Sequence, residues 1–198
     1  MKQSAFGVIA ILVFLNVNAQ TQRIIFREPL LYPEGTVFNN KTNLFFVSSV
    51  TNGTIGTVDM QGNYKVFYND TSLKSTFGMR IDNKRNRLWV CSGDPNYSKV
   101  SDSSTHKKLI RLIGLDITSG KKAEDINLSN VYNGKHFAND LTLDNGGNIY
   151  ITDSYSPVIY KVDANGKASV FAASDLFKGE DVGLNGIVFN PKGFAANC

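Results

Sequence analysis

The sequence has little of what would mark several common protein classes. Its 198 residues include two cysteines, Cys91 and Cys198, which excludes a dense disulfide framework. Cys91 lies within the apolar run 88–91 and is expected to be a small core residue. Beyond the N-terminal segment, no apolar run is long enough to cross a bilayer. No convincing helical periodicity is present either, so the regular structure is expected to consist of strands.

Two hydrolase motifs are also missing. Neither a G-x-S-x-G nucleophile motif nor an H-E-x-x-H zinc motif occurs, which argues against a serine hydrolase and a zinc protease. The net charge of +4 is small and the basic residues are scattered. This charge distribution argues against a nucleic-acid partner.

The N-terminal residues 1–19 have the pattern of a secretory signal peptide. Lys2 provides a short positive region, residues 5–15 form an apolar run too short to span a bilayer, and Ala19 is a small residue suited to cleavage. The pattern predicts a protein that is secreted or exported to a periplasm, with no membrane attachment after cleavage.

The remainder, residues 20–198, is dominated by a repeated pattern of short strands and tight turns. Residues 139–175 are expected to form four strands joined by turns such as Asn145-Gly146-Gly147. The same pattern occurs at 34–70, again from Gly78 with an insertion at 94–108, and a last time from Asn185. Four short antiparallel strands in about 36 residues are typical of a β-propeller blade. The sequence therefore predicts an all-β propeller, with blades beginning near residues 34, 78, 139 and 185.

About three and a half blades cannot close a ring, because propellers have roughly four to eight blades. Residues 194–198 do not continue the last blade in the expected pattern. A truncated sequence is the favoured explanation; completion by a partner chain and an open fragment are the alternatives.

The repeat alignment places Glu34, Gly78, Asn139 and Asn185 at one equivalent position. The first strand of each propeller blade lines the central channel, so these residues are expected to face one axis. Carboxylate and amide oxygens are ligands of hard cations such as Ca²⁺, and one carboxylate would leave the ion charge to act as a Lewis acid. An all-oxygen set argues against a structural zinc site. The alternative is that these residues only shape turns.

Four other residues are candidates for lesser roles. Asp153 could support the metal ligands, although a solvated aspartate at a strand end is the favoured interpretation. His136 could act as an acid or base near the channel mouth, or be a loop histidine. Trp89 and Phe77 are expected to pack between blades.

Three motifs give the chain a resemblance to a known family: Pro33-Glu34-Gly35, Asn139-Asp140 and Leu184-Asn185-Gly186-Ile187. With these it resembles the regucalcin/gluconolactonase-like, or senescence-marker-protein-like, family of six-bladed propellers, over the N-terminal part of a family domain. The resemblance implies that Glu34, Asn139 and Asn185 hold a divalent cation, usually calcium, with zinc or magnesium as alternatives. It also implies hydrolysis of a small lactone or ester.

The family places a further aspartate, a base or ligand, downstream, and this sequence has no counterpart. The catalytic residues therefore stay unassigned, and this chain is expected to be inactive by itself. The alternative function is a non-catalytic propeller of the NHL type that binds a sugar, peptide or protein. The oligomeric state is left open.

Overall fold

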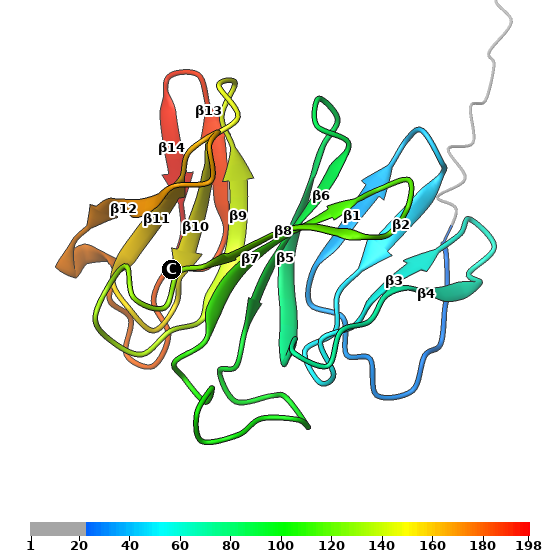
Figure 1. Cartoon of the computed structure of the whole chain (residues 1–198), viewed down its shortest axis with the longest axis horizontal. Coiled ribbons are helices and arrows are strands. Elements are labelled where there is room, and N and C mark those ends of the chain that lie inside the picture. Colours follow the sequence, from blue (N-terminus) through cyan, green and yellow to red (C-terminus); the bar gives the residue numbers. More distant parts are fainter. Residues whose placement is uncertain (1–22) are drawn as a thin grey trace, which may run out of the picture.

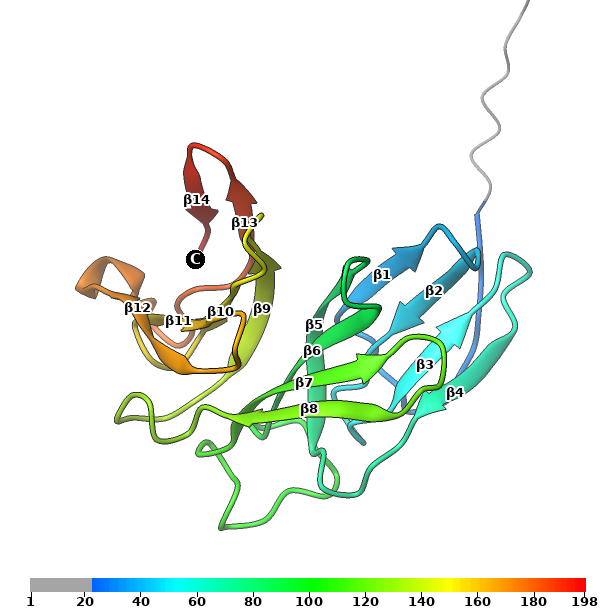
Figure 2. The ribbon, with the colours of Figure 1, turned by 45° about the horizontal axis from the view of Figure 1, so that its top comes forward.

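The computed structural model describes residues 23–198, and the predicted signal peptide lies outside these residues. The described chain forms three four-stranded antiparallel sheets and one two-stranded sheet. Figure 2 shows these sheets side by side along an open arc. This arrangement confirms the predicted all-β propeller.

Each full sheet is a blade whose strands pair in chain order. Blade 1 comprises β1 (Thr36–Asn39), β2 (Leu44–Val47), β3 (Ile55–Val58) and β4 (Tyr64–Tyr68). Blade 2 comprises β5 (Ser75–Asp82), β6 (Arg87–Gly93), β7 (Ile110–Asp116) and β8 (Lys122–Asn127). Blade 3 comprises β9 (Ala138–Leu143), β10 (Ile149–Asp153), β11 (Val158–Val162) and β12 (Ala168–Ala173).

A short 3₁₀ helix, η1 (Asp175–Phe177), leads from blade 3 to the half blade, which consists of β13 (Ile187–Asn190) and β14 (Gly193–Ala196). The expectation that residues 194–198 would not continue the blade was wrong, since β14 pairs with β13 along its whole length. Within residues 23–198, no helix is both long enough and apolar enough to cross a membrane.

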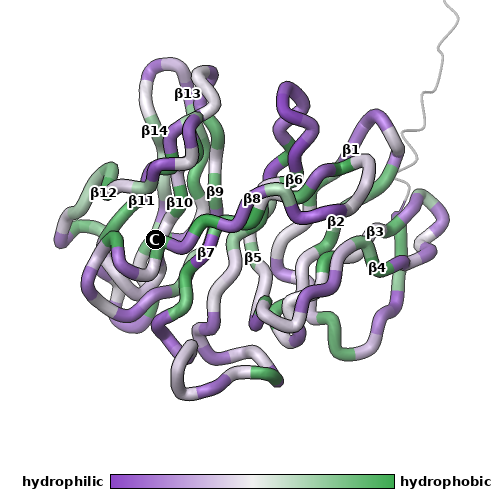
Figure 3. Tube along the Cα trace, in the orientation of Figure 1, coloured by the Kyte–Doolittle hydropathy of each residue, from purple (hydrophilic) through white to green (hydrophobic). Residues whose placement is uncertain are grey.

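Glycines and aspartates end the strands at tight turns. The β3–β4, β9–β10 and β11–β12 hairpins share a turn in which an aspartate side chain accepts the main-chain N–H four residues on, as Asp144 Oδ1 does from Asn148 at 2.9 Å. Gly62, Gly147 and Gly166 occupy the same place in these turns with φ of 86°, 82° and 83°. Glycine adopts such values without steric cost, so these motifs fix where the strands reverse. Figure 3 shows the hydrophilic segments gathering at such hairpin tips.

The apolar core lies between neighbouring blades. One cluster joins blades 2 and 3 and includes Phe77, Trp89 and Cys91, as expected from the sequence. A second cluster joins blades 1 and 2 around Phe46 and Leu88, and a third joins blade 3 to the half blade. Each blade thus buries its faces against its neighbours. Cys91 and Cys198 are both free.

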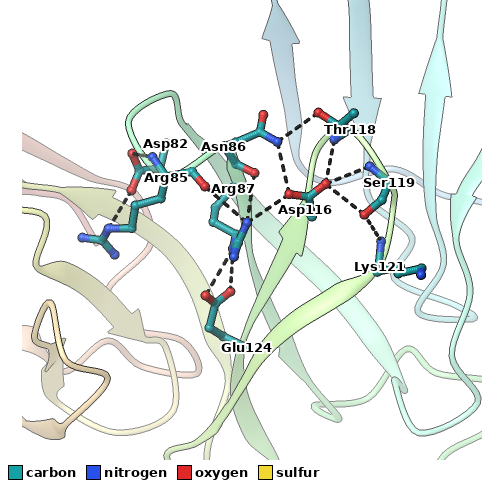
Figure 4. Close-up of polar contacts among 9 residues, drawn as sticks. All are labelled: Asp82, Arg85, Asn86, Arg87, Asp116, Thr118, Ser119, Lys121 and Glu124. Carbon is teal, nitrogen blue, oxygen red and sulfur yellow. Dashed lines mark hydrogen bonds and ion pairs between the residues drawn. The ribbon is translucent and has the colours of Figure 1, made fainter.

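Blade 2 carries a polar network at the hairpin ends of its strands (Figure 4). The Arg87 guanidinium pairs with Glu124 at 2.9 Å and with Asp116 at 3.1 Å. Asp116 also accepts N–H groups from Thr118 and Ser119 in the β7–β8 turn. The network therefore ties β6, β7 and β8 together.

The strand register corrects one detail of the repeat alignment. Met79 pairs with Val90 in blade 2, and Leu141 pairs with Ile151 in blade 3. Counting back from these pairs, Phe77 and not Gly78 is equivalent to Asn139. The physical reason is turn length: residues 83–86 separate Asp82 from Arg87, whereas only residues 145–147 separate Asp144 from its hydrogen-bonded partner Asn148.

Candidate cation site at the first strands

The first strands of adjacent blades, β1, β5, β9 and β13, lie next to one another along the inner side of the arc (Figure 1). Together they line a cavity of about 280 Å³. Its lining comprises Glu34, Gly35, Thr36, Gly78, Met79, Arg80, Asn139, Asp140 and Asn185. The three residues that the sequence nominated as cation ligands, Glu34, Asn139 and Asn185, therefore share one cavity, although two of them lie 105 residues apart (139 − 34).

A break in the strand pairing brings two consecutive residues to this cavity. Side chains normally alternate between the two faces of a strand. In β9 the register shifts between the Leu141–Ile151 pair and the Ala138–Asp153 pair, so that Asn139 and Asp140 both lie opposite Thr152. This irregularity has the form of a β-bulge, which re-aims side chains. Both Asn139 and Asp140 consequently line the cavity.

Asn139 has an oxygen suited to a ligand. Its side chain is 8% exposed, and its Nδ2 donates to Ser154 Oγ at 2.9 Å. Its Oδ1 is buried and has no hydrogen-bond partner among the described residues. A buried acceptor left unpaired costs about 1–3 kcal/mol. A cation in the cavity would satisfy this oxygen, so the environment of Asn139 fits a cation ligand.

Two hydroxyl groups that sequence reasoning missed hold the main chain around the cavity. Thr152 Oγ1 donates to the Asn185 carbonyl at 2.6 Å and accepts the Asp140 N–H at 3.1 Å. Ser154 Oγ, besides binding Asn139, donates to the Leu184 carbonyl. These bonds join blade 3 to the half blade where Asn139 and Asn185 approach each other.

The same hydrogen bond recurs in blade 1. Ser48, which occupies the register position of Thr152, accepts the Gly35 N–H at 2.8 Å and the Glu34 N–H at 3.4 Å. In both blades the hydroxyl-bearing residue directly follows the apolar run of the second strand, as Ser48 follows 44–47 and Thr152 follows 149–151. This shared position could have indicated in the sequence that the hydroxyls bind the first strand.

The cavity carries three formal charges. Partial burial and, to a lesser extent, the nearby Asp140 carboxylate raise the pKa of Glu34. Asp140 pairs with the Arg80 guanidinium at 2.8 Å and accepts the Ile187 N–H at 3.3 Å. Two carboxylates, Glu34 and Asp140, and one guanidinium, Arg80, give the lining a formal charge of one negative unit. No motif pointed to Arg80, which comes from blade 2, the blade that lacks a ligand oxygen.

Asp153 and His136 do not line this cavity; they form a buried brace beside it. Asp153 Oδ2 lies 2.8 Å from His136 Nδ1 and accepts the Tyr160 hydroxyl at 3.0 Å. Asp153 Oδ1 accepts the N–H groups of Phe137, Tyr155 and Ser156 at 2.9–3.1 Å. Burial and, to a lesser extent, the negative charge of Asp153 raise the pKa of Tyr160.

Asp153 is not a solvated aspartate, because it is fully buried. His136 does lie in the loop before β9, as a loop histidine would, although it is only 2% exposed. The brace fixes the chain immediately before Ser154, the residue that holds Asn139. Among residues 23–198, no group of three His, Cys, Asp or Glu side chains is arranged to hold a metal ion.

No protein-family model matches the chain, and no curated protein matches it in sequence. Solved structures do match in fold. The Malassezia sympodialis allergen Mala s 1 superposes with a TM-score of 0.65 at 18% identity, covering 84% of this chain and 60% of the allergen chain. A chain of a nidogen/laminin complex gives 0.62 at 16%, covering 87% of this chain and 57% of its own.

A proposed gluconolactonase gives a TM-score of 0.58 at 16% identity, covering 86% of this chain and 57% of its own. These likenesses show a shared propeller-type fold. The chain spans about 57–60% of the length of these three structures.

Proposed function

We propose that the cavity at the first strands binds a calcium ion through Glu34, Asn139 and Asn185. The observation that carries this proposal is the unpaired, buried Oδ1 of Asn139 on the same cavity as a carboxylate and a second amide. Oxygen donors of this kind suit calcium, while magnesium is a less favoured alternative because it demands stricter geometry. Zinc is disfavoured, because it prefers histidine and cysteine.

The charge of the site indicates a weak rather than a tight calcium site. Glu34 is the one lining carboxylate that is not ion-paired, because Arg80 pairs with Asp140. Calcium affinity rises with ligand charge, and extracellular modules bind with dissociation constants on the order of 0.1–1 mM. Export of the protein, which we propose from residues 1–19, would place the site in a compartment where such an affinity is useful.

For the whole protein we propose hydrolysis of a small lactone or ester. A bound divalent cation supplies a Lewis acid that polarises a carbonyl oxygen. Glu34 and the two asparagines would hold the ion, and Ser154 and Thr152 would keep those asparagines in place. The likeness in fold to a proposed gluconolactonase supports this choice of chemistry.

Calorimetric titration of the 198-residue chain with CaCl₂ tests the cation site. We expect Glu34→Gln to weaken binding at least tenfold, because it removes the unpaired carboxylate. Glu180→Gln, which makes the same change at an exposed residue outside the cavity lining, should bind as the wild type does. Absence of binding by the wild type, or equal binding by Glu34→Gln, would refute the proposal.

The second candidate is a non-catalytic propeller that binds a sugar, peptide or protein. The Arg80–Asp140 ion pair inside the cavity favours it, because it neutralises one of the two carboxylates that could attract a cation. Failure of calcium binding in the titration above would make this the better explanation. Lactone and ester hydrolysis by the whole protein, measured with calcium and with a chelator, separates the two functions.

A further inference from the structure

A second cavity adjoins the candidate cation site and shares Glu34 with it. Its volume is about 430 Å³. We call it the aromatic mouth; besides Glu34, it is lined by Tyr32, Pro33, Val50, Phe77, Tyr97 and Phe137. Its size is within the range of small-molecule sites.

Three blades contribute to the aromatic mouth. Phe77 of β5 and Phe137, which precedes β9, pack with ring centres 4.7 Å apart. Phe77 is fully buried and Phe137 is 6% exposed, so both are fixed by the core. Tyr97, with its ring centre 6.4 Å from that of Phe137, and Tyr32 stand at the rim, 52% and 61% exposed.

The rim is held in place by main-chain and side-chain contacts. Tyr97 belongs to the insertion 94–108, which extends from the end of β6 at the bottom of Figure 1. This insertion is fastened to blade 1 by the Lys99 N–H, which donates to the Thr51 carbonyl at 2.8 Å, and to blade 3 by Asn96, which donates to the Tyr155 hydroxyl at 2.8 Å.

Tyr32 adopts a backbone conformation that side chains rarely take. Its φ is 43°, in the left-handed region, which costs a non-glycine residue conformational energy. Its carbonyl accepts the Val50 N–H at 3.4 Å. The buried neighbour Leu31 and the hydrogen bonds of this segment hold Tyr32 in that conformation, so that its ring stands at the rim of the aromatic mouth.

The strand register explains why this side of the site is apolar. At the position where blades 1 and 3 and the half blade present Glu34, Asn139 and Asn185, blade 2 presents Phe77. A molecule whose carbonyl lies at the cation cavity would therefore place its other part against aromatic rings over blade 2. Hydroxyl groups buried there would find few partners, and unpaired polar groups disfavour binding.

We infer that the aromatic mouth binds the aryl or alkyl part of the substrate, so that the substrate class is apolar lactones or esters and not polyhydroxylated sugar lactones. This inference rests on the proposed function for the position of the reacting carbonyl. The binding of an apolar group at Tyr32 and Tyr97 does not itself require a bound cation, so the two proposals can be tested separately.

The test uses two neutral amides that the protein would not hydrolyse readily, 3-phenylpropanamide and gluconamide. Binding is measured by ligand-observed NMR, first with a chelator and then with calcium. We expect 3-phenylpropanamide to bind in both conditions and gluconamide to bind at least tenfold more weakly. Equal binding of the two amides, or no binding of 3-phenylpropanamide, would overturn the inference.

Variants locate the binding at the rim. Tyr97→Ser should weaken 3-phenylpropanamide binding at least fivefold, and Tyr32→Ser provides a second, independent rim variant if the first does not fold. Phe38→Ser, at an exposed aromatic residue of β1 outside the aromatic mouth, is the matched control and should bind normally. Unchanged binding in a folded rim variant would contradict the assignment.

The outcomes also separate this inference from the cation proposal. Calcium binding without 3-phenylpropanamide binding would overturn the aromatic mouth and leave the cation site standing. Binding of 3-phenylpropanamide without any calcium binding would support the aromatic mouth and refute the cation site.

Discussion

Replacing Ser154 by alanine should affect stability and calcium affinity together. Ser154 is 4% exposed, and its hydroxyl accepts the Asn139 Nδ2–H and donates to the Leu184 carbonyl. The substitution removes both bonds and leaves two buried polar groups without these partners. If calcium binds through Asn139 Oδ1, the substitution also frees that amide to rotate away.

The size of each effect follows from these contacts. An unsatisfied buried group costs about 1–3 kcal/mol, so the two groups together predict a loss of roughly 2–6 kcal/mol in the free energy of unfolding. Residues that orient a metal ligand typically change metal affinity about 10–100-fold. We therefore expect Ser154→Ala to raise the calcium dissociation constant at least about tenfold.

Ser156→Ala is the matched control, because Ser156 is equally buried and lies in the same segment after β10. Its hydroxyl donates to the Lys135 carbonyl at 2.7 Å and has no contact with Asn139. Urea unfolding should show a loss of about 1–2 kcal/mol for this single bond. Its calcium affinity should equal that of the wild type.

Urea unfolding and calorimetric titration of the two variants decide the matter. The reasoning fails if folded Ser154→Ala binds calcium as tightly as the wild type, since Asn139 would then not depend on Ser154. It also fails if Ser156→Ala loses as much affinity as Ser154→Ala, because a general loss of rigidity would then explain both results.

Three further predictions concern titration and buried bonds. The raised pKa of Glu34 means that calcium must displace a proton at low pH, so affinity should fall as pH drops from neutral toward 4.5; titrations showing constant affinity over this range would contradict the ligand role. Burial alone would raise the pKa of Asp70, but hydrogen bonds, including one from Lys122, hold it well below its ordinary value of 3.8. This stabilisation is present above pH 3.8 and lost below it, so Lys122→Met should cost up to about 1 kcal/mol in urea unfolding at neutral pH and less at pH below 3.8. Tyr160→Phe removes a buried hydroxyl bonded to Asp153 and should cost about 1–2 kcal/mol in urea unfolding, a loss that an unchanged midpoint would exclude.

The fold was predictable because its signals are local. Turn motifs such as Asn145-Gly146-Gly147 and β-branched runs between them mark hairpins wherever they occur, and the four strands expected within residues 139–175 are observed as β9 to β12. Equivalent residues of repeated blades lie at equivalent places around the propeller axis. For this reason the sequence could predict a shared cavity for Glu34, Asn139 and Asn185. Whether they bind a cation stays a prediction.

What the sequence did not reveal depends on contacts between distant segments. The Asp153–His136 pair joins residues 17 positions apart, and neither residue type at that spacing signals a buried brace. Arg80 reaches Asp140 across 60 positions. The equivalence of Phe77 with Asn139 was missed because the turn after β5 is one residue longer than the turn after β9, and only strand pairing reveals such a slip.

The equivalence of Phe77 with Asn139 also identifies which second-strand residue of blade 2 corresponds to Ser48 and Thr152. Ser48 and Thr152 occupy the same register position, and each accepts the N–H of the residue that follows Glu34 or Asn139. Blade 2 has Cys91 at this position, and a thiol is a weak acceptor. Burial raises the pKa of Cys91 well above its ordinary value, so it stays an uncharged core side chain.

Polar support thus accompanies polar residues at the cavity. In blades 1 and 3, a hydroxyl group hydrogen-bonds to the main chain directly after Glu34 or Asn139, the residues with side-chain oxygens. In blade 2, packing in the apolar core holds Phe77 instead. Each of these hydroxyls accepts a main-chain N–H group, a structural role that fixes the chain beside Glu34 and Asn139 whether or not a ligand is bound. The proposed cation site would therefore be built on first strands held by hydrogen bonds, and the aromatic mouth on a first strand held by packing.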